Sequence, residues 1–143
     1  MSAAAVLTMT LMTFVAAQDK TERFGVALDA KAYPQATPKE ALESVIEAAE
    51  AKKVDYVVAQ LADPEFIDDR VKRVYGGKFE EQVEDTRSRL GPFALKQLKR
   101  FLDEGKWAVG KDQATVTLDG EKDRRVKLVK KGERWYLANG WSK

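Results

Sequence analysis

The spacing of apolar residues changes once along this chain, and that change decides which fold classes remain open to it. Before Trp107 apolar residues recur every three to four positions, as Leu95, Leu98 and Phe101 do. After Trp107 they alternate with polar residues, beginning at residues 114–118. The first spacing is that of a helix with one buried face, and the second is that of a half-buried strand. Helices first and strands last predict an α+β protein, with helices packed on one face of an antiparallel sheet.

Start and stop signals divide the first part of the chain into five helices. Capping residues followed by proline start two of them, at Thr37-Pro38 and at Asp63-Pro64. Glycine and proline interrupt the helical spacing at Gly76-Gly77 and at Gly91-Pro92. The predicted helices therefore begin near residues 38, 55, 64, 78 and 92, and the last one ends near residue 105.

The second part of the chain predicts a meander of three strands, with room for one more. The strands cover residues 114–118, 124–130 and 134–137, and short links between them make neighbouring strands antiparallel. Alternation directs Val126 and Leu128 toward the helices. The residues expected on the outward face are Thr115, Thr117, Arg125, Lys127 and Tyr136.

The 143 residues suffice for one domain, and the chain divides into three parts. Residues 1–17 are uncharged and end in Val15-Ala16-Ala17, which predicts a secretory signal peptide cut before Gln18. An uncut hydrophobic anchor and a cytosolic protein are the alternatives, and after cleavage no stable membrane insertion is expected. Residues 18–36 are a polar lead-in, and residues 37–143 are the single α+β domain.

Four segments carry a family resemblance: residues 37–41, 51–62, 114–118 and 128–137, the last with a basic residue before Trp135. In this order they resemble the nuclear transport factor 2-like superfamily, and within it small exported bacterial domains of unknown function. The resemblance implies a cone-like fold over roughly residues 37–138. Ketosteroid isomerases and polyketide cyclases are its catalytic branches, but the matching segments contain no catalytic motif.

The chain contains neither cysteine nor histidine. These absences exclude disulfides, thiolate and histidine metal sites, cysteine nucleophiles and histidine-based triads. Asp63, Asp68 and Asp69 lie close in sequence, but their spacing is not that of a calcium loop, and Asp63 before Pro64 predicts a helix cap. We therefore expect no cofactor and no metal, and the sequence identifies no catalytic residue.

Three aromatic residues are candidates for lining a pocket: Tyr56, Tyr75 and Trp135. The two tyrosines would supply phenolic donors, as a tyrosine does in the ketosteroid isomerases. The alternative is that both tyrosines lie at the edge of the core with the hydroxyl in water. Trp135 alternates with Leu137 on the last predicted strand, which indicates a core residue.

Charge is distributed unevenly, although the formal net charge is only +2. Residues 37–69 contain nine acidic and three basic residues, and residues 106–143 contain ten basic and five acidic residues. Arg125 and Lys127 give the sheet a basic outward face, which can attract polyanions. No aromatic stacking motif accompanies these bases, so no specific nucleic acid is expected. Facing copies of this surface would repel, which predicts a monomer or a weak oligomer.

These observations favour a non-catalytic domain that is exported to the periplasm, the cell envelope or the medium. There it would bind a protein or small molecule that the sequence does not identify. One alternative is a pocket of the isomerase or cyclase type, which needs an enclosed apolar hollow with a buried carboxyl group of raised pKa. The other is a polyanion-binding module that uses the basic strands.

Overall fold

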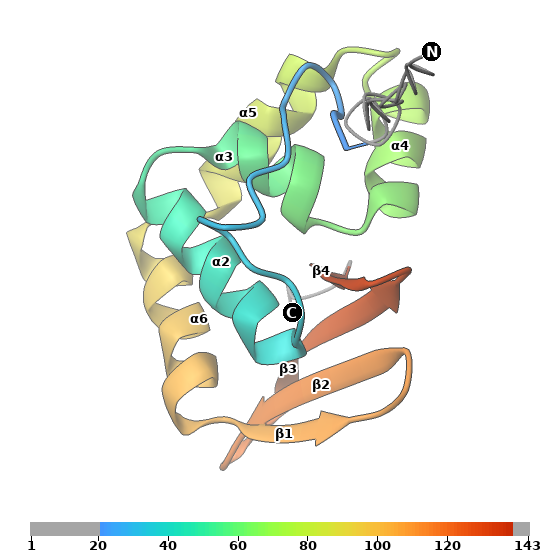
Figure 1. Cartoon of the computed structure of the whole chain (residues 1–143). Helices are drawn as coiled ribbons and strands as arrows, with labels where there is room; N and C mark the ends of the chain where they lie inside the picture. Colours follow the sequence, from blue (N-terminus) through green and yellow to red (C-terminus); the bar gives the residue numbers. More distant parts are fainter. Residues whose placement is uncertain (1–20, 139–143) are drawn as a thin grey trace, which may run out of the picture.

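Helices and strands follow one another in the predicted order. The structure is a computed structural model, and it describes residues 21–138. Within them a helical part precedes an antiparallel sheet, which confirms the α+β class (Figure 1). The helices are α2 (Pro38–Glu50), α3 (Val54–Tyr56), the π-helix η1 (Val57–Leu61), α4 (Pro64–Arg73), α5 (Phe79–Arg89) and α6 (Pro92–Glu104). The expected signal segment, residues 1–17, lies outside the described residues.

The sheet has four strands, in the order β1-β2-β3-β4. They are β1 (Lys106–Val109), β2 (Gln113–Leu118), β3 (Glu121–Lys131) and β4 (Arg134–Leu137). β1 is the additional strand for which the sequence left room. The start of β3 corrects the prediction, which began that strand at residue 124. Gly120 adopts a φ of 80°, so a tight turn returns the chain to β2, and a register shift between Thr117 and Leu118 accommodates it.

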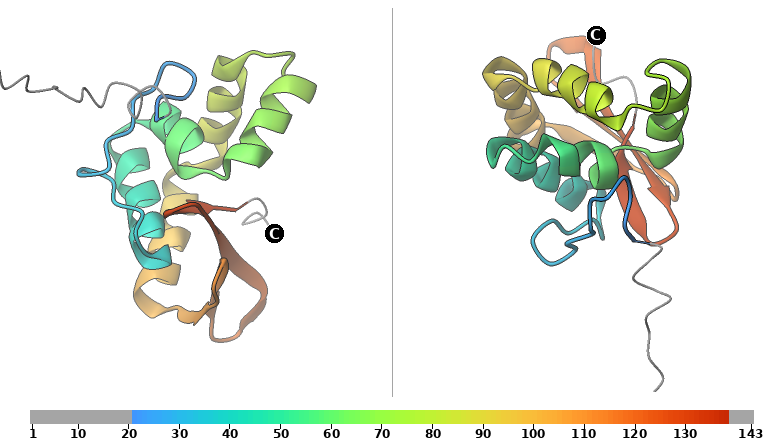
Figure 2. Two further views of the ribbon diagram at one scale, coloured as in Figure 1. Left: turned by 45° about the vertical axis from the view of Figure 1, so that its right-hand side comes forward. Right: turned by 90° about the horizontal axis from the view of Figure 1, so that it is seen from above.

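The largest apolar cluster, here called the main core, lies between the sheet and two helices. α2 and α6 lie side by side on one face of the sheet (Figure 2). Leu42 of α2 and Leu98 of α6 are almost fully buried there, together with Val126 and Leu128 of β3. Arg125 and Lys127, which alternate with the two buried positions on β3, are exposed and half-buried respectively, so the predicted alternation of that strand is confirmed.

A second, smaller apolar cluster belongs to α3, η1, α4 and α5, which we call the helical lobe. In Figure 2 α4 and α5 lie at the β4 side of the sheet, away from β1. The buried residues of this cluster are Val54, Val58, Ile67, Val71 and Val83, with Phe66 and Phe79 partly buried against them. Ala62 forms a parallel bridge to Leu137, and the Asp63 N–H donates to the Leu137 carbonyl at 2.9 Å. The lobe is therefore joined directly to the end of β4.

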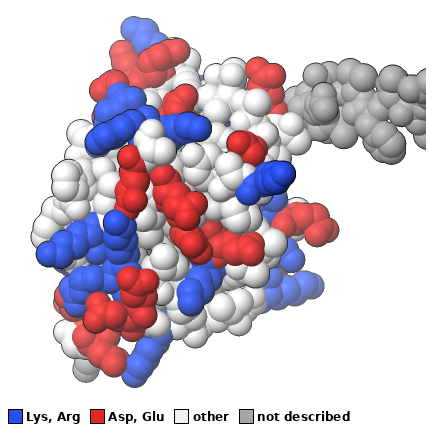
Figure 3. All heavy atoms as spheres, turned by 60° about the vertical axis from the view of Figure 1, so that its left-hand side comes forward, with Lys and Arg blue, Asp and Glu red and all other residues white. Residues whose placement is uncertain are grey.

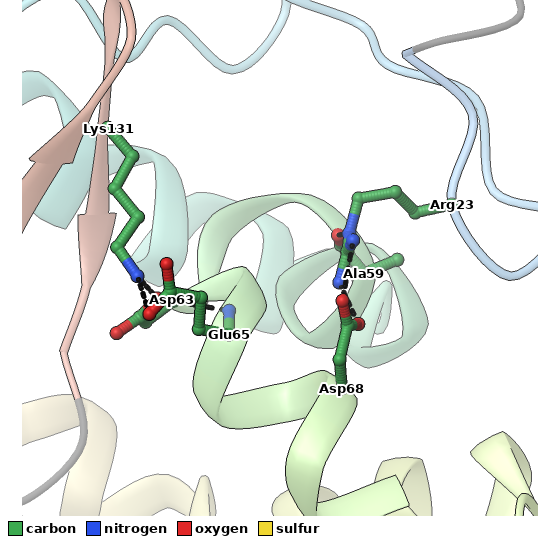
Figure 4. Close-up of polar contacts among 6 residues, drawn as sticks. All are labelled: Arg23, Ala59, Asp63, Glu65, Asp68 and Lys131. Carbon is green, nitrogen blue, oxygen red and sulfur yellow. Dashed lines mark hydrogen bonds and ion pairs between the residues drawn. The ribbon is translucent and has the colours of Figure 1, made fainter. Parts of the chain in front are cut away.

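The described part of the lead-in, residues 21–36, is fastened to both regions by polar contacts. The fully buried Gln60 side chain donates to the carbonyl oxygens of Thr21 and Val26 at 2.6 and 2.8 Å. Arg134 donates to the Gln35 side chain at 2.7 Å. Arg23 binds the Ala59 carbonyl and the Asp68 carboxylate, as Figure 4 shows. Buried amide groups need such partners, and these contacts supply them.

Tyr136 is the outward position whose exposure the sequence predicted wrongly. It lies opposite Val129, on the same face as Arg134, but only 7% of it is exposed. The Arg134 guanidinium lies over its ring at 5.0 Å from the centroid and helps to cover it. The outward face is therefore less open near β4 than alternation alone implies. Within residues 21–138, no helix is long and apolar enough to span a membrane.

Candidate functional site

The three expected pocket residues lie in three different environments. Tyr56 packs against Tyr33 in the main core, and its hydroxyl accepts the Asp29 N–H at 3.0 Å. Burial raises the pKa of this hydroxyl, and the Asp29 hydrogen bond offsets that only in part. Tyr75 lies just after α4, where its hydroxyl accepts from Arg70 at 3.2 Å. Trp135 is buried in the main core, as its alternation with Leu137 predicts.

A different set of residues lines a partly open cavity of about 110 Å³ in the helical lobe. We call it the α4–α5 cleft, and none of Tyr56, Tyr75 and Trp135 lines it. Its apolar wall consists of Val57, Val58, Ala62, Phe66, Ile67, Leu90, Leu137 and Ala138. Its polar lining consists of Arg70, Gln82, Asp85, Thr86 and Arg89. A mostly apolar wall with a few converging polar groups is the usual form of a small-molecule site.

The cleft exists because α5 turns a polar stripe toward α4. Gln82, Asp85, Thr86 and Arg89 follow one another at the spacing i, i+3, i+4 and i+7, so they share one face of the helix. Apolar residues normally occupy the face that a helix turns inward. On α5 the apolar spacing runs through Phe79, Val83 and Leu90, and it gives no sign of the polar stripe beside them. The same spacing rule, applied to polar residues, detects the stripe but does not tell an inward face from an exposed one.

On the opposite wall, α4 contributes Arg70, whose side chain is fixed from several sides. Its Nε donates to the Gln82 Oε1 at 3.1 Å, and its Nη2 donates to the Tyr75 hydroxyl at 3.2 Å. The guanidinium carbon also lies 5.6 Å from the ring centroids of both Phe66 and Tyr75. Only 27% of the side chain is exposed. Arg70 is thus a cation held in place before any ligand arrives.

Asp85 lies between two guanidinium groups at the rim of the cleft. Its Oδ2 is 3.2 Å from Nε of Arg89 and 3.7 Å from Nη2 of Arg70. Within the described residues, Arg89 makes no other side-chain ion pair or hydrogen bond. The lining therefore carries two cations and one anion, and guanidinium donors remain available beside an apolar wall.

The outward face of the sheet carries the two basic residues that the sequence singles out. Arg125 lies opposite Thr117 and Lys127 lies opposite Thr115, so two adjacent rows each pair a base with a small polar residue. Arg125 is exposed and Lys127 is half-buried. Neither has an acidic partner within residues 21–138. Arg125 and Lys127 thus give this face of the sheet a basic surface.

Acidic residues gather on the opposite side of the molecule, along α2. Figure 3 shows a band of acidic side chains across the face to which α2 and α6 contribute. The Glu40 N–H donates to the hydroxyl of the capping Thr37 at 3.1 Å, and the Glu40 carboxylate accepts the Ala36 N–H at 3.0 Å. Glu50 pairs with Lys99. Glu43 and Glu47 are exposed. This band is a solvated helix surface.

The acidic residues at the start of α4 serve structural roles. The Asp63 carboxylate accepts the Glu65 N–H at 3.2 Å, which confirms the predicted helix cap. Lys131 reaches Asp63 at 2.6 Å and Glu65 at 3.2 Å (Figure 4). Burial lowers the pKa of Lys131, but the hydrogen bonds to these two carboxylates outweigh it, so the pKa is raised. No acidic cluster suited to a metal ion occurs among residues 21–138.

No protein-family model matches the chain, and no curated protein or solved structure matches it. The resemblance to the nuclear transport factor 2-like superfamily therefore stays a prediction. The α4–α5 cleft is the candidate site that the geometry itself provides.

Proposed function

We propose that this protein is a non-catalytic binding domain that holds a small ligand in the α4–α5 cleft. The observation that carries the proposal is the cleft itself, a cavity of about 110 Å³ with an apolar wall and fixed polar groups at its rim. Asp85, the carboxylate in its lining, is ion-paired with two arginines. This pairing orders the two arginines at the rim of the cleft.

The experiment uses butan-1-ol, an uncharged probe of matching size, and follows backbone amide signals by NMR. Titration to tens of millimolar should shift the signals of cleft residues such as Val58, Ile67 and Thr86. Ala62 lines the cleft, so Ala62→Leu should fill it and abolish these shifts. Ala94→Leu makes the same change at a half-buried position of α6 outside the cleft and should leave them intact. Shifts that are absent in the native protein, or that survive Ala62→Leu, would refute the proposal.

A second candidate function is the binding of a polyanion by the outward sheet face. Arg125 and Lys127 support it because they are free of acidic partners within the described residues. Binding of polyphosphate should then fall on Arg125→Gln/Lys127→Gln and weaken steeply with salt. Lys39→Gln/Lys72→Gln removes the same charge from exposed helix positions and is the control. Equal losses for the two double variants would leave only a nonspecific charge effect and reject this candidate.

We also propose that the domain acts outside the cytoplasm. The support is the uncharged segment 1–17 with Val15-Ala16-Ala17 at its end. The intact mass of the native protein should match a chain that begins at Gln18 or next to it. A soluble cytosolic chain that retains residues 1–17 would contradict export.

A further inference from the structure

We infer that the α4–α5 cleft takes a short aliphatic carboxylate, and that Asp85 competes with this ligand for the arginines at the rim. The inference rests on the proposed function and names the ligand class of that site. It follows from the net charge of the lining, from the arginine N–H donors that have no partner among the described residues, and from the volume of the cavity.

The lining selects for an anion. Arg70 and Arg89 bring two positive charges to the cleft, and Asp85 brings one negative charge. A ligand anion at the rim would meet a net positive lining, whereas a ligand cation would have to displace one of the arginines. Arginine is suited to this role because its planar fork matches the two oxygens of a carboxylate.

The donors that the ligand needs are already in place. Arg70 uses Nε and Nη2 for its contacts with Gln82, Tyr75 and Asp85, which leaves Nη1 without a partner among the described residues. Arg89 uses only Nε, toward Asp85, so both of its terminal nitrogens remain. Because Gln82, Tyr75 and Phe66 fix Arg70, little side-chain entropy is lost when it binds a ligand.

The apolar wall limits the rest of the ligand to a short chain. The cavity of about 110 Å³ is smaller than an engineered cavity of about 150 Å³ that admits benzene. An aliphatic chain of about four carbon atoms fits a space of that size. Val57, Val58 and Leu137 would contact the chain while the carboxylate stays at the rim.

Asp85 occupies the arginine donors for which a ligand carboxylate has to compete. One oxygen of its carboxylate already serves both arginines, at 3.2 and 3.7 Å. A ligand carboxylate that reaches the same donors lies within several ångströms of this negative charge and is repelled by it. Asp85 thus holds the two arginines in position in the empty cleft and lowers the affinity for the anion that enters.

The test compares butanoate binding to the native protein, to Asp85→Asn and to Glu84→Gln, by NMR titration at about 10 mM salt, where screening is weak. The native protein should bind butanoate more tightly than butylamine. Asp85→Asn should bind it about fivefold to tenfold more tightly than the native protein, because one nearby negative charge is gone. Glu84→Gln makes the same charge change at the adjacent position, which pairs with Arg87 and does not line the cleft, and should change the affinity less than twofold.

The outcomes separate this inference from the proposed function. If butan-1-ol shifts the cleft signals but butanoate binds no better than butylamine, the ligand class is wrong and the binding function stands. If Asp85→Asn and Glu84→Gln tighten binding equally, Asp85 is no competitor and only net charge matters. If neither butan-1-ol nor butanoate affects the cleft, the proposed function fails and the inference with it. Asp85→Ser is the second variant, should Asp85→Asn not fold to the native circular dichroism spectrum.

Discussion

Helices pack differently in the main core and in the helical lobe. In the main core, α2 and α6 turn apolar stripes onto an apolar sheet face, and Leu42, Leu98 and Leu128 are almost fully buried. In the lobe, α5 turns Gln82, Asp85 and Thr86 toward α4, and a cavity remains between the two helices. The buried residues of the smaller apolar cluster are valines and one isoleucine, which cover less apolar surface than the leucines of the main core.

The comparison indicates that the closely packed core that stabilises this small domain and the cleft proposed to bind a ligand lie in different regions. Close packing in the main core supplies most of the hydrophobic stabilisation, because that term grows with the apolar area removed from water. The lobe can keep a hollow and a charged stripe because it is fastened to this core through Ala62 and Leu137. The predictions below test this separation, in order of decreasing effect.

The largest effect is expected in the main core. Leu128→Ala should lower the free energy of unfolding by about 3–4 kcal/mol, because it removes a fully buried side chain and leaves a cavity. Urea unfolding followed by circular dichroism measures this loss.

A matched pair of valines sharpens the comparison. Val126→Ala in the main core and Val71→Ala in the lobe make the same change at buried positions. Val126→Ala should cost about 2–3 kcal/mol and Val71→Ala about 1–2 kcal/mol, because Val71 borders an open hollow beside Phe24, where the surroundings collapse more readily. Equal losses would mean that the two regions are packed alike, and the comparison would be wrong.

The two ends of α6 give a second test. A Cβ at Gly105 would clash with the Val116 side chain and with the Phe101 carbonyl oxygen, because α6 passes tightly into β1 there. Gly105→Ala should therefore cost about 2–3 kcal/mol through overpacking. Gly91, at the start of α6, has open space where its Cβ would be.

Thermal unfolding of the two alanine variants checks this prediction. Gly91→Ala should change the free energy of unfolding by less than about 1 kcal/mol, the size of a lost helix cap. A Gly105→Ala protein as stable as Gly91→Ala would show that the joint between α6 and β1 is looser than the structure has it.

The sequence predicted the main core well and the cleft not at all, for physical reasons. The main core consists of apolar stripes, and periodicity detects these wherever they are longer than a few residues. The sequence left room for β1 but did not place it, because Lys106–Val109 is a short edge strand in which only Trp107 is half-buried. Alternation placed Tyr136 on the correct face, but it could not reveal that Arg134 covers it.

The cleft depends on contacts between distant segments, which no local pattern reports. Leu137, Val58 and Arg70 meet there from β4, η1 and α4. The polar stripe on α5 was visible in the sequence, but an exposed helix face has the same spacing. Only the position of α4 shows that the stripe faces inward.

Tyr56→Phe should have a moderate effect in the main core. Without the hydroxyl, the Asp29 N–H loses its acceptor, so the free energy of unfolding should fall by about 1 kcal/mol at neutral pH.

The folded-state pKa of Tyr56 is raised above the unfolded value of 10.0, so the unfolded chain loses this proton first as pH increases. The native protein should therefore lose stability above pH 10, and its advantage over Tyr56→Phe should shrink there. Chemical unfolding at several pH values measures both effects, and Tyr33→Phe, which removes the hydroxyl of the ring packed against Tyr56, is the control. An advantage that stays constant from neutral pH to well above pH 10 would contradict a buried, protonated Tyr56.

The smallest effect concerns the polar connection between the sheet and the lobe. Lys131 at the end of β3 reaches Asp63 and Glu65 at the start of α4, and 30% of its side chain is exposed. Lys131→Met keeps the aliphatic stem and removes the charge, so it should cost at most about 1 kcal/mol at neutral pH. Lys127→Met is the matched control, because Lys127 makes no ion pair within the described residues.

The sign of the pH dependence follows from the raised pKa of Lys131. The contribution of the Lys131 charge to the free energy of unfolding is complete below the unfolded-state pKa of 10.5. It disappears as pH rises through the higher folded-state pKa. Both proteins in this comparison carry Tyr56→Phe, so that Tyr56 does not titrate. The difference in free energy of unfolding between Tyr56→Phe and Tyr56→Phe/Lys131→Met should therefore close above pH 10.5. A difference that persists at high pH would mean that packing of the Lys131 stem, and not its charge, connects the helical lobe to the sheet.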